Sequence, residues 1–112
     1  MNRVIQYGGR LHVSAITVGE LYTWALRSKA SPKRMTKLID FLNEVTILEV
    51  DDSVAYQFGV IRAAQLDAGL PSPELDMMNA ATALVHGLTM VTHNTQDYAN
   101  VPGLSLADWM NP

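Results

Sequence analysis

A single glycine near the end of the chain joins two stretches of different character. Residues 76–86, which include an Ala-Ala-Thr-Ala run, predict a helix, and residues 88–92 are typical of a strand. Because only Gly87 separates them, the chain must reverse there, and the two elements are expected to lie antiparallel. The helix would span about 15 Å, and the strand about 16 Å. Asp76 is therefore expected level with the carboxyl end of the strand, near Asp97.

The rest of the chain alternates strands with helices. Three serine-proline or aspartate-rich segments are typical of helix starts, and each follows a turn or a strand. This alternation predicts an α/β fold in which helices cover both faces of a parallel sheet. At 112 residues, the chain is expected to form one domain, residues 1–112. The predicted strands are residues 11–16, 46–50, 88–92 and a short edge strand at 104–106.

Three acidic residues are expected at one edge of this sheet. Glu20 begins the helix after strand 11–16, while Asp76 and Asp97 flank the carboxyl end of strand 88–92. Carboxylates gathered within a few ångströms repel one another unless a cation offsets their charge. Their oxygen ligands suit Mg²⁺ or Mn²⁺ better than zinc. The spacing therefore predicts a divalent cation site.

Each acid taken alone also has a purely structural interpretation. Glu20 fits a capping box that begins at Thr17, and Asp97 can cap a short helix together with Asn94. Asp76 can complement a helix dipole, although at the fourth helical position this interaction contributes little. The expected meeting of all three acids at one place favours the metal site over three separate caps.

Composition excludes several other kinds of site. The chain contains no cysteine, so disulfides, thiolate metal sites and thiol catalysis are excluded. The three histidines, His12, His86 and His93, lack the spacing of zinc ligands and are interpreted as structural or exposed. No apolar run reaches the roughly 20 residues needed to span a membrane. A cytoplasmic protein is therefore expected.

The net charge of -3 argues against a broadly basic nucleic-acid-binding surface, but the basic residues are unevenly placed. Such a segment is either a solvated helix face or a surface that contacts RNA phosphates. Five of the eight lysines and arginines lie in one segment: Arg27, Lys29, Lys33, Arg34 and Lys37.

Three motifs follow one another along the chain in the order found in the PIN domain, and the chain resembles that family, specifically the VapC-type toxins of toxin–antitoxin pairs. Residues 14–21 are similar to the family's serine–threonine–glutamate segment, which carries its second acid at Glu20. Asp76 and the alanine-rich run after it resemble the segment with the third acid. Residues 91–98 resemble the closing motif, which carries Asn94 and a fourth acid, Asp97. The resemblance extends from about Arg10 to Trp109.

The resemblance implies a metal-dependent ribonuclease with one or two Mg²⁺ or Mn²⁺ ions, an RNA substrate and an antitoxin partner. Glu20, Asp76 and Asp97 would be the catalytic metal ligands. Asn94 would orient the closing loop, and Thr17 and Thr92 would support the ligands. RNA would reach the site over the basic segment from Arg27 to Lys37.

The family's opening strand, which ends in its first acid, has no counterpart here. Residues 1–19 contain no acid, and Met1 to Gly9 resembles the end of the family's second helix. The central strand is therefore expected to be missing, which leaves a gap between strands 11–16 and 88–92. Direct pairing of those two strands, or a segment near Val4 from a second copy in a homodimer, would close it.

Three hypotheses follow from this departure. The chain is a nuclease, impaired by the loss of one acid, or a PIN-fold module without effective catalysis that acts in dimerisation or antitoxin binding. The third is an α/β protein unrelated to the family.

Overall fold

The computed structural model describes residues 4–7, 10–92 and 94–108 of the chain. It confirms an α/β fold of alternating strands and helices. Within the described residues, no helix is both long and apolar enough to cross a membrane. The elements in chain order are β1 (Val4–Tyr7), β2 (Arg10–Ser14), α1 (Ala15–Leu26), α2 (Lys33–Leu42), β3 (Thr46–Leu48), α3 (Asp52–Asp67), α4 (Glu74–His86), β4 (Thr89–Val91), the 3₁₀ helix η1 (Thr95–Tyr98) and β5 (Ser105–Ala107).

The centre of the sheet is occupied by the first strand of this same chain. The strand order is β3-β2-β1-β4-β5, and β1 runs antiparallel to both of its neighbours. Ile5 lies opposite His12 on β2 and opposite Met90 on β4. The expected open gap is therefore absent, and the expected helix end is wrong for residues 4–7. Residues 1–3 and 8–9 of that prediction lie outside the described residues.

The outer strand pairs, in contrast, follow the parallel pattern that the alternation predicted. β2 pairs with β3 in parallel, and β4 pairs with β5 in parallel. Because β2 and β4 are both antiparallel to β1, they point in the same direction. Their carboxyl ends, at Ser14 and Val91, therefore lie at the same edge of the sheet with the width of β1 between them.

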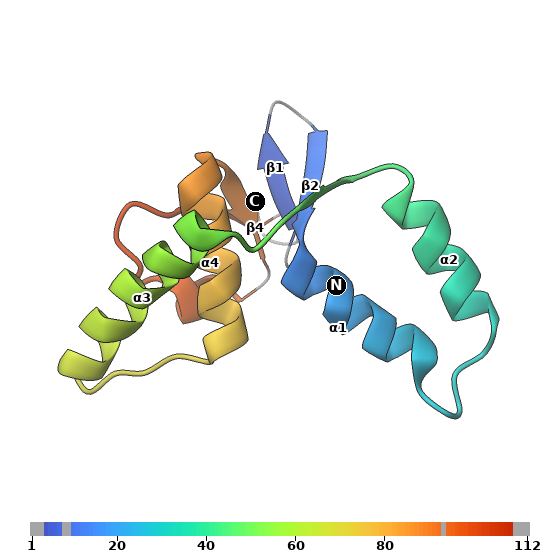
Figure 1. Cartoon of the computed structure of the whole chain (residues 1–112), viewed down its shortest axis with the longest axis horizontal. Helices are drawn as coiled ribbons and strands as arrows, with labels where there is room; N and C mark the ends of the chain where they lie inside the picture. The colour runs from blue at the N-terminus through green and yellow to red at the C-terminus, as the bar shows by residue number, and fades with distance from the viewer. Residues whose placement is uncertain (1–3, 8–9, 93, 109–112) are drawn as a thin grey trace.

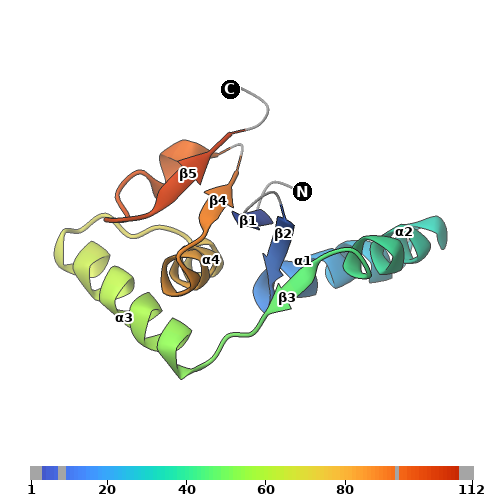
Figure 2. The same ribbon diagram turned by 90° about the horizontal axis from the view of Figure 1, so that it is seen from above.

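Helices cover both faces of the sheet, as expected. In Figure 1 and Figure 2, α3 and α4 lie on one side of the strands, while α1 and α2 extend away on the other. Met90 packs in the cluster that includes residues of α3 and α4. Its neighbour Val91 packs with Val13, Val18 and Phe41 in a second cluster. This alternation along β4 places a hydrophobic core on each face of the sheet.

Short-range signals define the ends of the helices that cover the first face. The Asp51 side chain caps α3 by accepting a hydrogen bond from the Val54 backbone N–H at 3.0 Å. Gly69 and Gly87 both have left-handed φ angles, of 71° and 64°. Gly87 is the C-cap of α4, and the chain turns there into β4 as the sequence predicted.

Candidate functional site

The start of α1 differs from the predicted capping box. The helix begins at Ala15, and its N-cap is Ser14, whose side chain accepts a hydrogen bond from the Thr17 backbone N–H at 3.1 Å. Thr17 is therefore the third helical residue rather than the cap, and the predicted capping box between Thr17 and Glu20 is wrong. Glu20 lies at the sixth helical position, where it has no capping role, and its side chain is half-buried.

Asp76 lies one position earlier in its helix than predicted. α4 begins at Glu74 with Pro73 at the N-cap, so Asp76 is the third helical residue and lies in the first turn. Ser72 lies before this helix, and its carbonyl accepts a hydrogen bond from Arg62 Nη1 at 3.0 Å. Because Asp76 lies in the first turn, its carboxylate interacts with the helix dipole more favourably than a residue at the fourth position would. Its side chain is nevertheless only 7% exposed, which is unusual for an acid whose only role is to complement a dipole.

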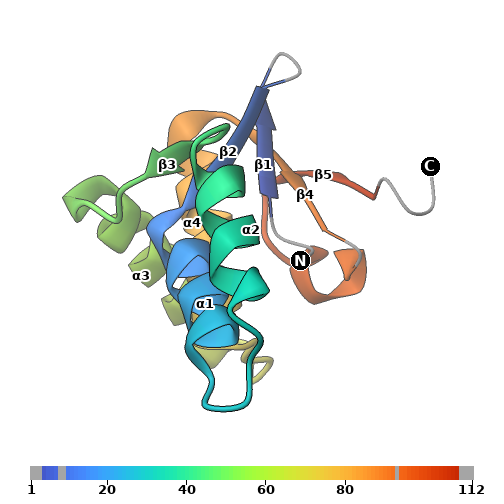
Figure 3. The same cartoon turned by 90° about the vertical axis from the view of Figure 1, so that its right-hand side faces the viewer.

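A polar contact between α1 and α4 brings the segments of Glu20 and Asp76 together. Asn79 of α4 accepts hydrogen bonds from the Ser14 hydroxyl and, at 3.3 Å, from the Thr17 hydroxyl. The two helices run in opposite directions from this contact (Figure 1 and Figure 3). Glu20 and Asp76 each lie one helical turn from the contact, on the same side of it.

Sequence reasoning missed Asn79 as a residue of this site. The signal was present, because Asn79 is the single amide in the run of residues 77–83, whose other members are methionine, alanine and one threonine. A buried helix normally holds an amide at such a position only when the amide has a hydrogen-bonding role.

The third acid, Asp97, lies on the segment that follows β4. Thr92 directly follows β4, is buried, and accepts a hydrogen bond from the Asn94 backbone N–H at 3.1 Å. Asp97 is exposed on η1, whose N-cap is Asn94, although the Asn94 side chain forms no capping hydrogen bond. With β1 between them, the ends of β2 and β4 are separated by two strand spacings, about 10 Å.

Among the described residues, the three acids are not gathered into one metal-binding group. Across residues 4–7, 10–92 and 94–108, no group of three or more acidic or histidine side chains is arranged to hold a metal ion. Their donor chemistry fits a hard cation, because all three offer carboxylate oxygens from one sheet edge. The joint metal site of Glu20, Asp76 and Asp97 stays a prediction. The predicted role of His93 lies outside the described residues.

The predicted RNA-contacting residues lie at the far end of the α1–α2 pair. Arg27 is the C-cap of α1, seven residues and about 10 Å beyond Glu20. Lys33 and Lys37 are exposed on the first two turns of α2. Arg34 is only half-exposed, and its Nη1 donates a hydrogen bond to the Trp24 carbonyl at 2.9 Å. Of the five basic residues, Arg34 therefore has a clear structural role in holding α2 against α1.

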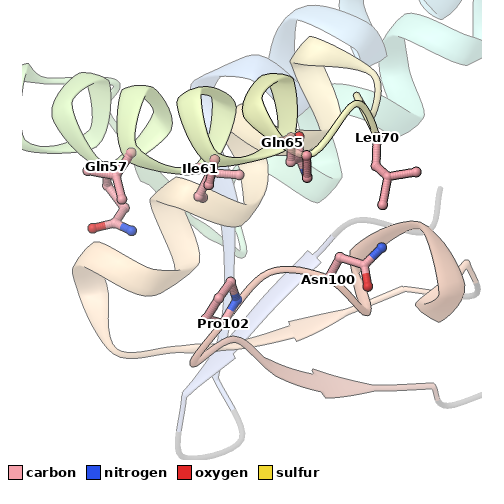
Figure 4. Close-up of a pocket in the computed structure, with 9 residues that line it drawn as sticks. Gln57, Ile61, Gln65, Leu70, Asn100 and Pro102 are labelled. Atoms are coloured by element: carbon pink, nitrogen blue, oxygen red, sulfur yellow. The ribbon is translucent and has the colours of Figure 1, made fainter.

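A cavity of about 210 Å³ lies elsewhere in the molecule, between α3 and the segment that follows η1 (Figure 4). Its walls are mainly apolar, and the Gln65 amide Nε2 beside it contacts Met77 Sδ at 3.2 Å. None of the predicted catalytic, metal-binding or RNA-contacting residues lines this cavity. The labelled lining residues are Gln57, Ile61, Gln65, Leu70, Asn100 and Pro102.

Comparison with known proteins decides the family. The sequence model of the PIN domain family matches residues 2–104, which is most of the chain. The chain belongs to the PIN domain family. The resemblance predicted from the three acidic motifs is thereby confirmed.

Several proteins with similar sequences carry ribonuclease names. Ribonuclease VapC2 of Haemophilus influenzae is 34% identical over 98% of this chain and 83% of its own length. The tRNA(fMet)-specific endonuclease VapC of Salmonella typhimurium is 32% identical over 89% of this chain and 76% of its own length.

A solved PIN domain structure confirms the fold. The chain superposes on the crystal structure of DNA-bound VapBC from Salmonella typhimurium with a TM-score of 0.83 at 32% identity. The superposition covers 88% of this chain and 74% of the solved one.

Proposed function

We propose that this chain is a VapC-type toxin ribonuclease, a single-domain cytoplasmic enzyme that cleaves RNA phosphodiester bonds with the help of Mg²⁺ or Mn²⁺. The observation that carries the proposal is the contact through which Asn79 joins the start of α1 to α4. It supports a shared site because Glu20 and Asp76 each lie one turn away on the same side. The ribonuclease names of the similar proteins support the choice of RNA as substrate.

Three carboxylates would hold the cation. Asp76 is buried and Glu20 half-buried, while Asp97 is exposed on η1. We propose that Asp97 approaches the other two when the ion and RNA bind. A bound divalent cation supplies polarisation of the phosphodiester and a more acidic water as the nucleophile.

Two further groups of residues would support this chemistry. Asn94 and Thr92 fix the turn that leads to Asp97 through the hydrogen bond between them. Thr17 supports the other half of the site through its contact with Asn79. Their role is to hold ligands in position, which in metal sites matters nearly as much as the ligands themselves.

The proposed site has fewer acids than the family pattern. β1 contains no acidic residue, and its first residue, Val4, lies opposite Val91 at the edge where the first acid of the family would lie. A site with three carboxylates attracts a divalent cation less strongly than a site with four. We therefore expect activity that requires millimolar Mn²⁺ or Mg²⁺.

RNA would approach over the exposed side chains at the end of the α1–α2 pair. Lys33 and Lys37 lie four residues apart on one face of α2, so both can contact neighbouring phosphates of a single strand. Arg27 and Lys29 extend the same surface toward Glu20. We exclude Arg34 as a principal RNA contact because its guanidinium is engaged with Trp24.

A second candidate function is partner binding without effective catalysis. Apolar side chains are exposed on the same α1–α2 pair, among them Leu26 at 69% and Ile39 at 49%. Such groups favour a protein partner, and the solved VapBC complexes support an antitoxin-like protein as that partner. A second copy of this chain is the alternative. The homodimer no longer follows from an open sheet, because β1 fills the gap.

A cleavage assay on single-stranded RNA tests the first function against the second. The purified chain should cut RNA with Mn²⁺, and both removal of the metal with a chelator and Asp76→Asn should abolish cutting. Asp51→Asn is the matched control, because it removes one carboxylate whose observed role is to cap α3, and asparagine caps a helix as well as aspartate does. RNA left intact by the wild-type chain at every Mn²⁺ concentration would favour the partner-binding module.

A further inference from the structure

Ser14, Thr17 and Asn79 form a buried polar contact in which the hydroxyl groups and the amide depend on one another. All three side chains are at most 2% exposed. The Ser14 hydroxyl accepts from the Thr17 backbone and donates to Asn79 Oδ1, so it serves the helix cap and the contact at once. The Thr17 hydroxyl donates to the same amide oxygen at 3.3 Å. The contact therefore joins the first turn of α1 to one side chain of α4.

The contact is not what stability alone would favour. Asn79 Nδ2 is buried and has no hydrogen-bond partner among the described residues. A buried donor without a partner costs free energy, which an apolar side chain of similar shape would avoid. The cap of α1 does not need Asn79 either, because Ser14 alone supplies the acceptor for the Thr17 N–H.

The position of the contact suggests why a buried Asn79 Nδ2 group, unpaired within the described part of the chain, is tolerated. Thr17 and Glu20 are three residues apart on α1, and Asn79 and Asp76 are three residues apart on α4, so each pair shares one helix face. A rotation or shift of either helix at the contact therefore changes the separation of the two carboxylates. Hydrogen bonds restrict such movements through their directionality, whereas the attraction between apolar groups is non-directional.

We propose that Asn79, acting through Ser14 and Thr17, is a positioning residue that sets the separation of the Glu20 and Asp76 carboxylates for a divalent cation. This inference rests on the proposed function, because it needs those two acids to be ligands. Asn79 itself does not touch the cation in this role, since its oxygen is occupied by two hydroxyl groups and its nitrogen is a donor.

The test compares two buried amides that differ in position. Asn79→Leu replaces the amide by its closest apolar shape, and Gln65→Met does the same for the second buried amide, whose Oε1 also lacks a partner among the described residues. Gln65 contacts Met77 on α4 but not α1, which makes it the matched control. Calorimetric titration with Mn²⁺ and metal-free thermal melts are measured for both variants and the wild type.

We expect Asn79→Leu to weaken Mn²⁺ binding 10- to 100-fold while the metal-free melting temperature is unchanged or higher. Gln65→Met should leave Mn²⁺ affinity within threefold of the wild type. In a double-mutant cycle, Thr17→Val combined with Asn79→Leu should weaken Mn²⁺ binding no further than Asn79→Leu alone, because both changes break the hydrogen bond between these two side chains and keep the Ser14 cap of α1. Additive losses would contradict positioning through Thr17.

Three results would overturn the inference in distinguishable ways. Equal Mn²⁺ affinity in the wild type and Asn79→Leu would remove Asn79 from the site while the proposed function stands. No measurable Mn²⁺ binding by the wild type would overturn both. Since leucine is larger than asparagine, Asn79→Ala is measured as well. A lower metal-free melting temperature in Asn79→Leu and Asn79→Ala, with Mn²⁺ affinity reduced in proportion to the loss of stability, would show that Asn79 acts in folding only.

Discussion

The guanidinium carbon of Arg34 lies 5.1 Å from the centre of the Trp24 ring, and its Nη1 donates a hydrogen bond to the carbonyl of the same tryptophan. Arg34, one residue of the basic segment, therefore makes a cation–π contact and also holds α2 against α1. Replacing it would disturb α2 itself, so any loss of RNA binding would have two explanations. The exposed lysines of α2 separate these effects.

Replacing Lys33 and Lys37 together by glutamine should weaken binding of single-stranded RNA without lowering the melting temperature. If each lysine contacts one phosphate, the slope of log affinity against log salt should become shallower by about 1.4, at roughly 0.7 per contact. Fluorescence anisotropy at several salt concentrations measures this slope. Arg34→Gln serves as the contrast and should lower the melting temperature, and an unchanged slope in the lysine variant would mean that α2 does not guide RNA.

Divalent metal should raise the melting temperature of the wild-type chain. A ligand that binds only the native state at a hundred times its dissociation constant adds about 2.7 kcal/mol to the free energy of unfolding. Thermal melts with millimolar Mn²⁺ or Mg²⁺ should therefore shift upward, and Asp76→Asn should abolish most of that shift. The Asp51→Asn variant should keep the full shift. Identical melts with and without either metal would leave helix-dipole stabilisation as the better explanation of Asp76.

Glu20→Gln should weaken Mn²⁺ binding, because glutamine offers the cation no charged oxygen. The cap of α1 should be unaffected, because Ser14 supplies it. Calorimetric titration gives the affinity, and Glu49→Gln, at an exposed position after β3, controls for the loss of one negative charge. Equal affinity in the two variants would exclude Glu20 as a ligand.

Two glycines should respond in opposite directions to replacement by alanine. Gly87 has a φ of 64°, which an L-residue adopts at a cost of roughly 1–2 kcal/mol, so Gly87→Ala should destabilise the chain. Gly19 lies inside α1, and a Cβ there would meet nothing within 4 Å. Gly19→Ala should therefore stabilise the chain by about 0.5–1 kcal/mol. Denaturant titration measures both changes, and similar shifts in the two variants would contradict the left-handed turn at Gly87.

The central position of β1 is tested by Ile5→Pro. Proline removes a backbone donor and is tolerated in a sheet only at edges or bulges, so this variant should lose its cooperative thermal transition. Light scattering on the same sample should show association, because β2 and β4 then expose unpaired backbone groups. A melt identical to that of the wild type would mean that β1 does not pair on both sides.

Local signals made much of the fold predictable. The cap of α3 at Asp51, its termination near Gly69 and the reversal at Gly87 depend on a few adjacent residues, and all three were read correctly. The strand at Val4–Tyr7 was not predicted, because four residues carry almost no periodic signal. Their conformation depends on pairing with β2 and β4, which distant parts of the chain provide.

The candidate site was predictable in its acids but not in its framework. Glu20, Asp76 and Asp97 could be selected because motif spacing and sheet topology place them at one edge. The sequence predicts a cap at Thr17 because Thr17-x-x-Glu20 fits a capping box. Ser14 lies three residues earlier and also carries a short hydroxyl side chain, and in the structure it is Ser14 that caps α1. Asn79 was missed because its partners are more than sixty residues away in the chain.

The antiparallel strand at the centre of the sheet also bears on the order in which the chain folds. β1 ends at Tyr7 and β2 begins at Arg10, so this pair closes a very short loop and should form early. The other edge of β1 pairs with β4 and must wait for nearly the whole chain. During synthesis from the N-terminus, the middle of the future sheet therefore remains an unpaired edge until the last third of the protein emerges. The risk of mispairing with another nascent copy is greatest in that interval, and it disappears once β4 docks.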